Sequence, residues 1–233
     1  MNIVITGASR GLGKAIAKAF AQEGNTLLLG SQNKVYLETM AAELQELAPG
    51  SRILHFNFDA GNKDSVLAFG AWVLQSVNEV DILVNNVGSY LPGSLHNEPE
   101  GTLEKMIELN LYSAYHLTRL LVPGMIANKS GHIFNMCSIA SLNAYANGGA
   151  YSVSKFALYG FSKNLREELK TFGIKVTHIL PGATYTDSWA ASGIDPNRLQ
   201  EADDVAKMIF AASQLSDRAC PEEIVLRPIL GDL

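Results

Sequence analysis

The chain has 233 residues, of which 47% are hydrophobic and 18% are charged, a composition typical of a globular protein with a substantial core. Its formal net charge of −5, without a Lys/Arg cluster, excludes the basic footprint of a nucleic-acid-binding protein. Its two cysteines, Cys137 and Cys220, are too few for a disulfide framework and fit a reducing compartment.

Short β-rich apolar runs alternate with longer helical patterns along the whole chain. Near-continuous apolar strands that alternate with helices are typical of a parallel sheet covered on both faces, and right-handed crossovers make such a sheet doubly wound. We therefore predict an α/β fold with one parallel sheet of about seven strands. The predicted strands are 2–6, 26–30, 52–58, 80–86, 132–138, 175–180 and 223–227, and the predicted helices are 13–24, 33–48, 63–77, 102–122, 151–170 and 202–215.

The chain shows no internal repeat, low-complexity tract or Pro/Gly/Ser-rich linker, so residues 1–233 are expected to form a single domain. The N-terminal stretch lacks the charged start and long apolar segment of a signal peptide. No apolar run approaches the ~20 residues that span a bilayer. We expect a soluble, cytoplasmic protein without a membrane partner.

The first predicted strand runs directly into a glycine-rich loop, Thr6-Gly7-Ala8-Ser9-Arg10-Gly11-Leu12-Gly13, which opens a helix. The G-x-x-x-G-x-G spacing is a relative of the dinucleotide-binding fingerprint, although it is not identical to it. Glycines permit a tight turn and a close backbone approach, and the helix N-terminus presents free N–H groups to a pyrophosphate. A glycine loop can also be a tight turn only, but its place between strand and helix favours a dinucleotide site.

The end of the second predicted strand bears on which dinucleotide is bound. An acidic residue there would accept hydrogen bonds from the ribose 2′-OH of NAD and repel a 2′-phosphate. Residues 30–34 read Gly-Ser-Gln-Asn-Lys and contain no acid, while Arg10 in the glycine loop could face the same ribose. This pattern favours NADP, with NAD as the alternative if Ser31 and Gln32 only form a polar turn.

Asn110 interrupts an apolar helical stripe formed by Leu103, Ile107, Ala114, Leu117 and Leu121. A polar amide on a buried stripe needs a hydrogen-bond partner, because an unpaired one costs free energy. From the residues alone, a satisfied structural asparagine and a functional one are equally good interpretations.

Tyr151 and Lys155 stand four residues apart on a predicted helix, so their polar tips can meet on one face. A nearby cation favours the phenolate, which prepares the tyrosine for proton transfer. The pair alone is a weak signal, since two snorkelling surface side chains would look the same. Ser138, at the end of the fifth predicted strand, lies where open α/β sheets bind ligands, although a strand-end hydroxyl often bonds its own backbone.

Assembled, these residues resemble the short-chain dehydrogenase/reductase family over essentially the whole chain. Thr6-Gly7-x-x-x-Gly11-x-Gly13 is similar to the family's cofactor loop, and Ser138 with Tyr151 and Lys155 is similar to its Ser-x12-Tyr-x-x-x-Lys active site. The segments Asn85-Asn86-Val87-Gly88 and Pro181-Gly182-x-x-x-Thr186 are similar to two further family motifs. The resemblance implies a Rossmann-like fold and hydride transfer between NADP(H) and a carbonyl or secondary alcohol.

The resemblance also implies roles for individual residues. Asn110 would complete a catalytic tetrad by positioning water that connects Lys155 to solvent, Lys155 would hold the nicotinamide ribose, and Asp59 would contact the adenine amino group. The implied catalytic residues are Asn110, Ser138, Tyr151 and Lys155, with no metal. The implied cofactor-binding residues are Gly7, Ser9, Arg10, Gly11, Leu12, Gly13, Ser31, Gln32, Asp59, Asn86, Gly88, Tyr151, Lys155, Pro181, Gly182, Thr184 and Thr186.

The departures from the family pattern remove no catalytic atom. Val87 replaces the usual alanine, Cys137 stands where a second serine is often found, and Thr184 stands where Val or Ile is usual. Gln32 replaces the basic residue often seen in members that prefer NADP. The histidines at 55, 132 and 178 have no metal-ligand spacing with carboxylates, so we interpret them as structural or solvated.

The helix that carries Tyr151 is apolar on most sides, with Val153, Phe156, Leu158 and Phe161 around it. A sheet covers only one face of a helix, so a second subunit is expected to cover another, and the family commonly forms dimers and tetramers. The sequence therefore predicts a homodimer or homotetramer.

The substrate lid is expected in residues 187–200, with Trp189 and Ile194 as its main apolar groups, and Tyr90, Leu91 and His96 are candidate pocket residues. The length of this lid suits a small or medium carbonyl compound. A 3-oxoacyl group on an acidic carrier protein is an alternative, for which Lys129 and Arg119 would be the basic contacts. A redox sensor would not need the Ser138–Tyr151–Lys155 set, and a sugar-nucleotide epimerase would need a larger C-terminal region.

Overall fold

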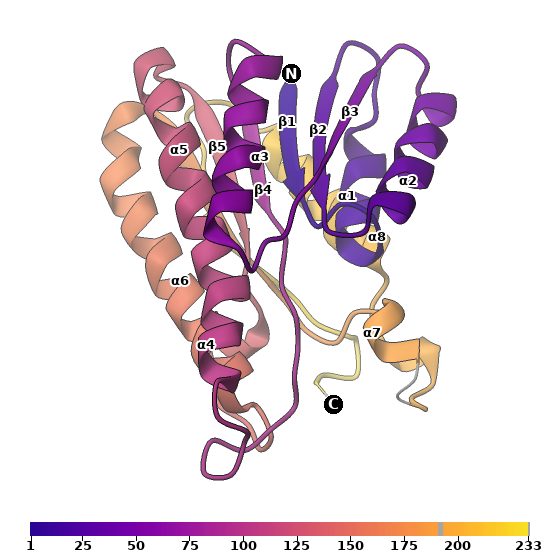
Figure 1. Ribbon diagram of the computed structural model, residues 1–233, viewed down its shortest axis with the longest axis vertical. Coiled ribbons are helices and arrows are strands. Elements are labelled where there is room, and N and C mark those ends of the chain that lie inside the picture. Colours follow the sequence, from indigo (N-terminus) through magenta and orange to yellow (C-terminus); the bar gives the residue numbers. More distant parts are fainter. Residues whose placement is uncertain (191–192, 233) are drawn as a thin grey trace.

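In the computed structural model, residues 1–190 and 193–232 are described, and they contain one seven-stranded sheet (Figure 1). The strands lie in the order β3-β2-β1-β4-β5-β6-β7, and every neighbouring pair is parallel. This arrangement confirms the predicted fold class. The strands are β1 Asn2–Thr6, β2 Thr26–Ser31, β3 Arg52–Asn57, β4 Ile82–Asn85, β5 Gly131–Met136, β6 Ile174–Pro181 and β7 Glu223–Leu226.

Helices cover both faces of the sheet, three principal ones on each (Figure 1). One layer consists of α1 (Gly11–Phe20), α2 (Lys34–Leu47) and α8 (Ala202–Ser213), and the opposite layer consists of α3 (Lys63–Ser76), α5 (Ser113–Asn128) and α6 (Gly149–Leu169). The shorter helices are α4 Thr102–Ile107, the π-helix η1 Glu108–Tyr112, the 3₁₀ turns η2 Ile139–Ser141, η3 Lys170–Phe172 and η4 Pro196–Arg198, and α7 Asp187–Ala190.

Successive side chains along each central strand pack alternately into two hydrophobic cores, one on each face of the sheet. In β1, Ile3 and Ile5 pack into the core under α1, α2 and α8, whereas Val4 packs into the core under α3, α5 and α6. Successive side chains of a strand point to opposite faces, so a strand buried on both faces must be apolar throughout. This requirement is why the central strands read as unbroken apolar runs.

The strand order creates a crevice at the carboxyl ends of the central strands. β1 pairs with β2 on one side and with β4 on the other, so the chain leaves β1 in one direction and returns on its opposite side. In open α/β sheets this switch point is where ligands bind, because the loops above it diverge. The glycine loop follows β1 directly and therefore lies at the crevice.

The chain is helical throughout the predicted span 102–122, but this helix is divided into α4, a π-helical turn and α5. The π turn contains Asn110, whose side chain is fully buried and bonds outside its own helix. Single π turns within helices occur mostly at functional positions. α5 also continues past Pro123 to Asn128, where the buried Met125 packs into the core.

A row of polar residues crosses the sheet at one level. Asn85, Asn135 and His178 are register neighbours in β4, β5 and β6, and all three are buried. Asn135 accepts a hydrogen bond from Asn85 at 2.8 Å, and its amide donates to Ser162 of α6 at 2.7 Å. Ser162 Oγ in turn lies 2.8 Å from Nδ1 of His178. Buried polar groups with partners specify one packing arrangement of strands and helices.

The histidines fit the structural or solvated interpretation. His132 is buried, with its Nε2 2.7 Å from Thr177 Oγ1, and His178 bonds Ser162, whereas His55 is exposed. Burial lowers the pKa of His132 to about 3 and also lowers the pKa of His178, because the imidazolium form loses its hydration.

Candidate active site

The glycine loop brings the backbone of β1 unusually close to helix α1. A Cβ built at Gly13 would lie 2.1 Å from the carbonyl oxygen of Gly7 and 2.7 Å from the side-chain nitrogen of Asn86, so only glycine fits there. Gly7 itself has φ +64°, a conformation that favours glycine. Arg10, the N-cap of α1, provides no side-chain cap, which leaves the first N–H groups of the helix open to an anion.

The segment after β4 is bound to the same loop by hydrogen bonds. Asn86 Nδ2 donates to the carbonyl oxygen of Thr6 at 2.9 Å, and the Thr6 hydroxyl accepts from the backbone N–H of Asn86 at 3.0 Å and of Val87 at 3.2 Å. Strands β1 and β4 thus end in one connected unit. A ligand that touches the glycine loop also meets the Asn86–Gly88 segment.

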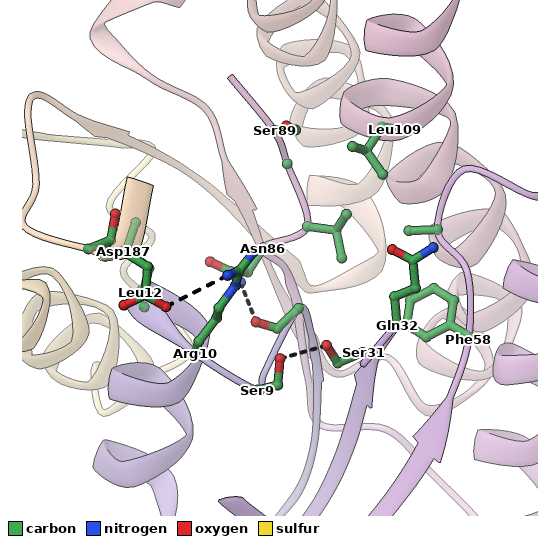
Figure 2. A pocket seen from close by; sticks show the side chains of 16 residues that line it. Ser9, Arg10, Leu12, Ser31, Gln32, Phe58, Asn86, Ser89, Leu109 and Asp187 are labelled. Atoms are coloured by element: carbon green, nitrogen blue, oxygen red, sulfur yellow. Dashed lines mark hydrogen bonds and ion pairs between the residues drawn. The ribbon is translucent and has the colours of Figure 1, made fainter. Parts of the chain in front are cut away.

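These two segments form walls of a cavity of about 380 Å³ (Figure 2). Ten of the residues predicted to bind the cofactor line it: Gly7, Ser9, Arg10, Gly11, Leu12, Ser31, Gln32, Asn86, Gly88 and Thr186. Six further lining residues were not predicted: Phe58, Ala60, Val87, Ser89, Leu109 and Asp187. The narrow approach at Gly13, the open helix N-terminus and the lining by the glycine loop fit a dinucleotide.

The two ends of this cavity differ in character. Gln32 and Phe58 lie together on one side in Figure 2, and Ser31 Oγ is 2.8 Å from Ser9 Oγ beneath them. Arg10 instead points across the mouth toward Asp187 of α7, with 3.8 Å between guanidinium nitrogen and carboxylate oxygen. Both partners are more than half exposed, so this ion pair contributes at most about 1 kcal/mol to stability.

The other predicted cofactor residues lie around the cavity without lining it. Gly13 packs beneath the loop, and Asp59 lies exposed between the lining residues Phe58 and Ala60. The hydroxyl of Thr184 donates to the Gly182 carbonyl at 3.0 Å and accepts from Gln200 at 2.8 Å. In the turn after β6, Thr186 reaches the cavity, whereas Pro181, Gly182 and Thr184 are not among its lining residues.

Ser138, Tyr151 and Lys155 come together at the carboxyl end of β5. The Ser138 side chain accepts a hydrogen bond from the Ala140 N–H at 3.1 Å and also interacts with the phenol of Tyr151. Lys155 is buried, and its Nζ donates to the carbonyl oxygen of Met136 at 2.7 Å and lies 5.9 Å from the centre of the Tyr151 ring. The hydroxyl therefore makes the local backbone bond and faces the tyrosine at the same time.

The charges of this cluster are governed by burial. Burial raises the pKa of Tyr151, and the hydrogen bond with Ser138 lowers it by a smaller amount. Burial also lowers the pKa of Lys155 to about 8. The expected lowering of the Tyr151 pKa by Lys155 is not found in the protein by itself, because the loss of hydration dominates the shift. Tyr151 is accordingly held as a neutral phenol, the form that donates a proton.

Asn110 joins the loop after β4 to helix α6. Its side-chain oxygen accepts from the Ser89 N–H at 2.8 Å, and its amide donates to the Ser89 carbonyl at 3.1 Å and to Ser154 Oγ at 2.8 Å. A Cβ placed on Gly88 would lie 3.3 Å from Asn110 Oδ1 and 3.2 Å from Lys155 Nζ. The Asn110 side chain thus has hydrogen-bond partners, as a structural asparagine would, and it also lies beside the lysine.

The candidate substrate residues lie in two groups. Tyr90 and Leu91 follow the cofactor segment directly and are 44% and 45% exposed, while His96 is exposed further along the same loop. The predicted lid, 187–200, begins in α7, and its residues 191 and 192 lie outside the described residues.

The structure contradicts the use of Lys129 as a contact for an acidic carrier protein. Lys129 ends α5 just before β5 begins, whereas Ser138 follows the end of that strand. The two residues therefore lie at opposite ends of strand β5. Arg119 lies within α5, where it donates to the Tyr115 hydroxyl at 2.7 Å.

Taken together, the doubly wound sheet, the glycine loop and the Ser–Tyr–Lys cluster define a nucleotide-binding α/β protein of the Rossmann type. A family model described as short chain dehydrogenase matches residues 1–197, and the chain belongs to that family. It is accordingly an oxidoreductase that acts on CH–OH or C=O groups. Within the described residues, no helix is long and apolar enough to cross a membrane.

Similar proteins are matched over nearly their full lengths. A sepiapterin reductase of Chlorobaculum tepidum is 29% identical, covering 99% of this chain and 97% of the relative. The structure of an alcohol dehydrogenase from the archaeon Thermococcus sibiricus, complexed with 5-hydroxy-NADP, has a TM-score of 0.91 at 27% identity and covers 100% and 98% of the two chains. A 7α-hydroxysteroid dehydrogenase complexed with NADH has a TM-score of 0.87 at 29% identity, covering 99% and 94%.

Proposed function

We propose that the protein is an NADP-dependent carbonyl reductase, or secondary-alcohol dehydrogenase in reverse, with Tyr151 as its general acid and base. The observation that carries this proposal is the meeting of Ser138, Tyr151 and Lys155 at the carboxyl end of β5, the end of the sheet where the glycine loop lines the cavity. A hydroxyl, a phenol and an ammonium gathered there match the needs of carbonyl reduction.

Reduction of a carbonyl builds negative charge on oxygen, which must be stabilised and then protonated. NADPH, when bound, would supply a hydride to the carbonyl carbon and would itself be oxidised to NADP⁺. Ser138 donates a hydrogen bond to the developing oxyanion, and Tyr151 transfers its phenolic proton to that oxygen to give the alcohol. Lys155 stabilises the resulting tyrosinate until solvent returns the proton, and its charge is present below a pKa of about 8.

The coenzyme preference rests on the cavity chemistry. No acid stands at residues 30–34, so nothing at the end of β2 repels a 2′-phosphate. Arg10 lines the same cavity and pairs only weakly with Asp187, so a phosphate dianion would compete well for its guanidinium. The Thermococcus sibiricus relative was solved with 5-hydroxy-NADP, which supports NADP, while the hydroxysteroid dehydrogenase with NADH keeps NAD as the alternative to be tested.

Two rival functions are less well supported. A non-catalytic redox sensor would have no need for Ser138 to face Tyr151, yet these groups interact. A reductase for carrier-bound 3-oxoacyl groups would need basic contacts near the site, and Lys129 lies at the other end of strand β5. A small-molecule ketone or alcohol is therefore the substrate we propose.

We further propose that residues 1–233 act as one unit in a cytoplasmic homodimer or homotetramer. Val153 and Phe156 on α6 are 38% and 43% exposed, and Tyr112 in the neighbouring segment is 47% exposed. Covering these groups with a second copy would remove apolar surface from water. The two free cysteines are consistent with a reducing compartment. Analytical ultracentrifugation at micromolar protein that found only monomer would contradict the assembly.

The function is tested by a coenzyme-oxidation screen. NADPH and NADH consumption would be measured over panels of aliphatic, cyclic and aromatic ketones, with Tyr151→Phe as the blank. We expect NADPH-dependent reduction of at least one ketone class that is lost in the variant. Reduction that continues unchanged in Tyr151→Phe would remove Tyr151 from the mechanism, and a tenfold preference for NADH would overturn the coenzyme assignment.

A further inference from the structure

Two tyrosines surround the catalytic phenol without lining the dinucleotide cavity. The Tyr90 ring lies 4.9 Å from the Tyr151 ring, centre to centre, at an interplanar angle of 81°. The side chain of Tyr145 interacts with that of Tyr90 and electrostatically with Tyr151. Three phenols thus converge from three segments: the loop after β4, the stretch before α6, and α6 itself.

The flanking rings remain open to solvent, although they lie beside a buried cluster. Tyr90 is 44% exposed and Tyr145 is 46% exposed. Large aromatic surfaces next to a reactive group are the usual sign of a ligand surface, because a ligand that covers them removes apolar area from water. Because the Tyr90 ring is in direct contact with the Tyr151 ring, the part of a substrate that covers these rings must be close to its reacting carbonyl.

Hydrogen bonds hold the two tyrosine-bearing segments in a fixed relation. Gly93 N–H donates to the Asn147 carbonyl at 3.1 Å, and Ser94 Oγ donates to the Asn147 side chain at 3.2 Å. Glu98 accepts from the Ala150 N–H at 3.2 Å, at the first turn of α6. A surface that is held before the ligand arrives loses less entropy on binding. The aromatic surface is therefore preorganised relative to Tyr151.

The same segments carry no positive charge. Neither 89–101 nor 139–150 contains Lys or Arg, and their only acidic residues are Glu98 and Glu100. Among the described residues next to Tyr151, the cation is Lys155, which is buried and donates to the Met136 carbonyl. A carboxylate or phosphate on the substrate would find no partner here and would meet the Glu98 carboxylate, which disfavours anionic substrates.

We propose, on the basis of the reductase function above, that Tyr90 and Tyr145 make the enzyme selective for uncharged ketones whose carbonyl carbon is attached directly to a planar aromatic ring. The ring packs edge-to-face or offset against the two phenol rings while the carbonyl oxygen reaches Ser138 and Tyr151. Aromatic pairs gain from this geometry beyond the area they bury, and a saturated ring of equal size does not.

The test compares acetophenone with cyclohexyl methyl ketone, which has the same carbon skeleton without the aromatic ring. With NADPH, we expect the wild type to favour acetophenone in kcat/KM by roughly fivefold or more. Tyr90→Leu and Tyr145→Leu should each reduce this ratio at least threefold, whereas Tyr90→Phe and Tyr145→Phe, which retain the rings, should keep most of it. Tyr36→Leu, an exposed tyrosine on α2, is the matched control and should leave the ratio unchanged.

A second measurement does not depend on turnover. Calorimetry on the NADPH complex of Tyr151→Phe would give the dissociation constants of both ketones, with and without Tyr90→Leu. If the wild type reduced neither ketone, the reductase function would fail. Tighter binding of acetophenone that depends on Tyr90 would still support this inference. Equal binding of the two ketones, or a wild-type preference that both leucine variants leave intact, would overturn it.

Substrate charge gives an independent readout of the same surface. The wild type should favour methyl 4-acetylbenzoate over 4-acetylbenzoate by at least fivefold, because the free carboxylate has no cation to meet. The opposite preference would overturn the selectivity for uncharged ketones, since a basic contact would then have to exist in this part of the site.

Discussion

The wall of the site that carries the glycine loop and the wall that carries Tyr90 and Tyr145 are held in place by different means. The first is fixed by local backbone geometry, with Gly7 at φ +64° and Gly13 in contact with the carbonyl of Gly7. The second depends on bonds between residues far apart in the chain, such as Ser94 with Asn147 and Glu98 with Ala150. One wall is tight and backbone-lined, and the other exposes aromatic side chains.

This difference matches the two tasks of the site. A dinucleotide presents the same pyrophosphate in every turnover, so a rigid loop of main-chain N–H groups suits it. A substrate pocket must distinguish between compounds, and side chains on loops can provide that discrimination without disturbing the sheet. Tyr151 and Lys155 lie between the walls, on the helix that both approach.

The largest effect expected is on the chemical step between the two walls, from Tyr151→Phe. Removing the proton donor should lower kcat about a thousandfold, within the range that general acid catalysis contributes, while the NADPH dissociation constant changes less than about threefold. Steady-state kinetics and fluorescence titration measure the two quantities, with Tyr36→Phe as control. A parallel loss of coenzyme affinity would mean that the two walls are not separable.

Gly13→Ala should have the next largest effect, on the cofactor wall. The new Cβ would lie 2.1 Å from the Gly7 carbonyl oxygen, so the loop must move and the NADPH affinity should fall about a hundredfold. Gly124→Ala is the matched control, because a Cβ at Gly124 of α5 meets nothing within 4 Å. NADPH affinity in Gly13→Ala within threefold of wild type would show that the close approach is not needed.

Asn110→Ala tests the hydrogen bonds by which Asn110 joins the loop after β4 to helix α6. It leaves the Ser89 N–H and carbonyl and the Ser154 hydroxyl without their partner, so the free energy of unfolding should fall by about 2–3 kcal/mol. Urea denaturation measures that loss, and kinetics under folded conditions measures turnover. A proton-relay role requires turnover to fall by more than about thirtyfold, which corresponds to roughly 2 kcal/mol. Smaller losses of turnover would leave Asn110 a structural brace only.

Acidification tests how the buried His132 of β5 affects the free energy of unfolding. His132 has a folded-state pKa of about 3 against an ordinary 6.5, so the unfolded chain binds more protons between these values and stability is lost as the pH falls through that window. From pH 7 to pH 5 this group should cost about 2 kcal/mol of unfolding free energy. His132→Gln should flatten the pH dependence measured by thermal unfolding, and His96→Gln, at an exposed position, should not.

The smallest effect expected is at the mouth of the cofactor wall. Arg10→Ala should weaken NADPH binding about tenfold and leave NADH binding within twofold, because only NADPH carries the 2′-phosphate. Asp187→Asn should strengthen NADPH binding about twofold, since it releases Arg10 from an exposed ion pair. Equal losses for both coenzymes in Arg10→Ala would place the guanidinium away from the 2′-phosphate.

Prediction from sequence was accurate for features that depend on residues close together in the chain, such as apolar runs and glycine spacing. The seven strands matched because each contains a run of apolar residues, with the central strands β4 and β5 buried at every position. The glycine loop matched because its spacing reflects a backbone requirement. The helix predicted over 102–122 is present, but its π turn was not predicted, because a π turn is not visible in apolar periodicity. Phe58 and Asp187 were missed as cavity residues because their sequence neighbours give no sign of the wall that they complete.

By itself, the sequence determined the doubly wound sheet, the dinucleotide loop and the identity of the Ser138, Tyr151 and Lys155 set, since these depend on residue type and short spacing. Only the tertiary structure decided that Tyr90 and Tyr145 meet beside Tyr151, that Arg10 faces Asp187, and that burial raises the pKa of Tyr151 despite the nearby lysine. The physical reason is that contact and desolvation depend on what distant segments place around a side chain, which no local pattern records.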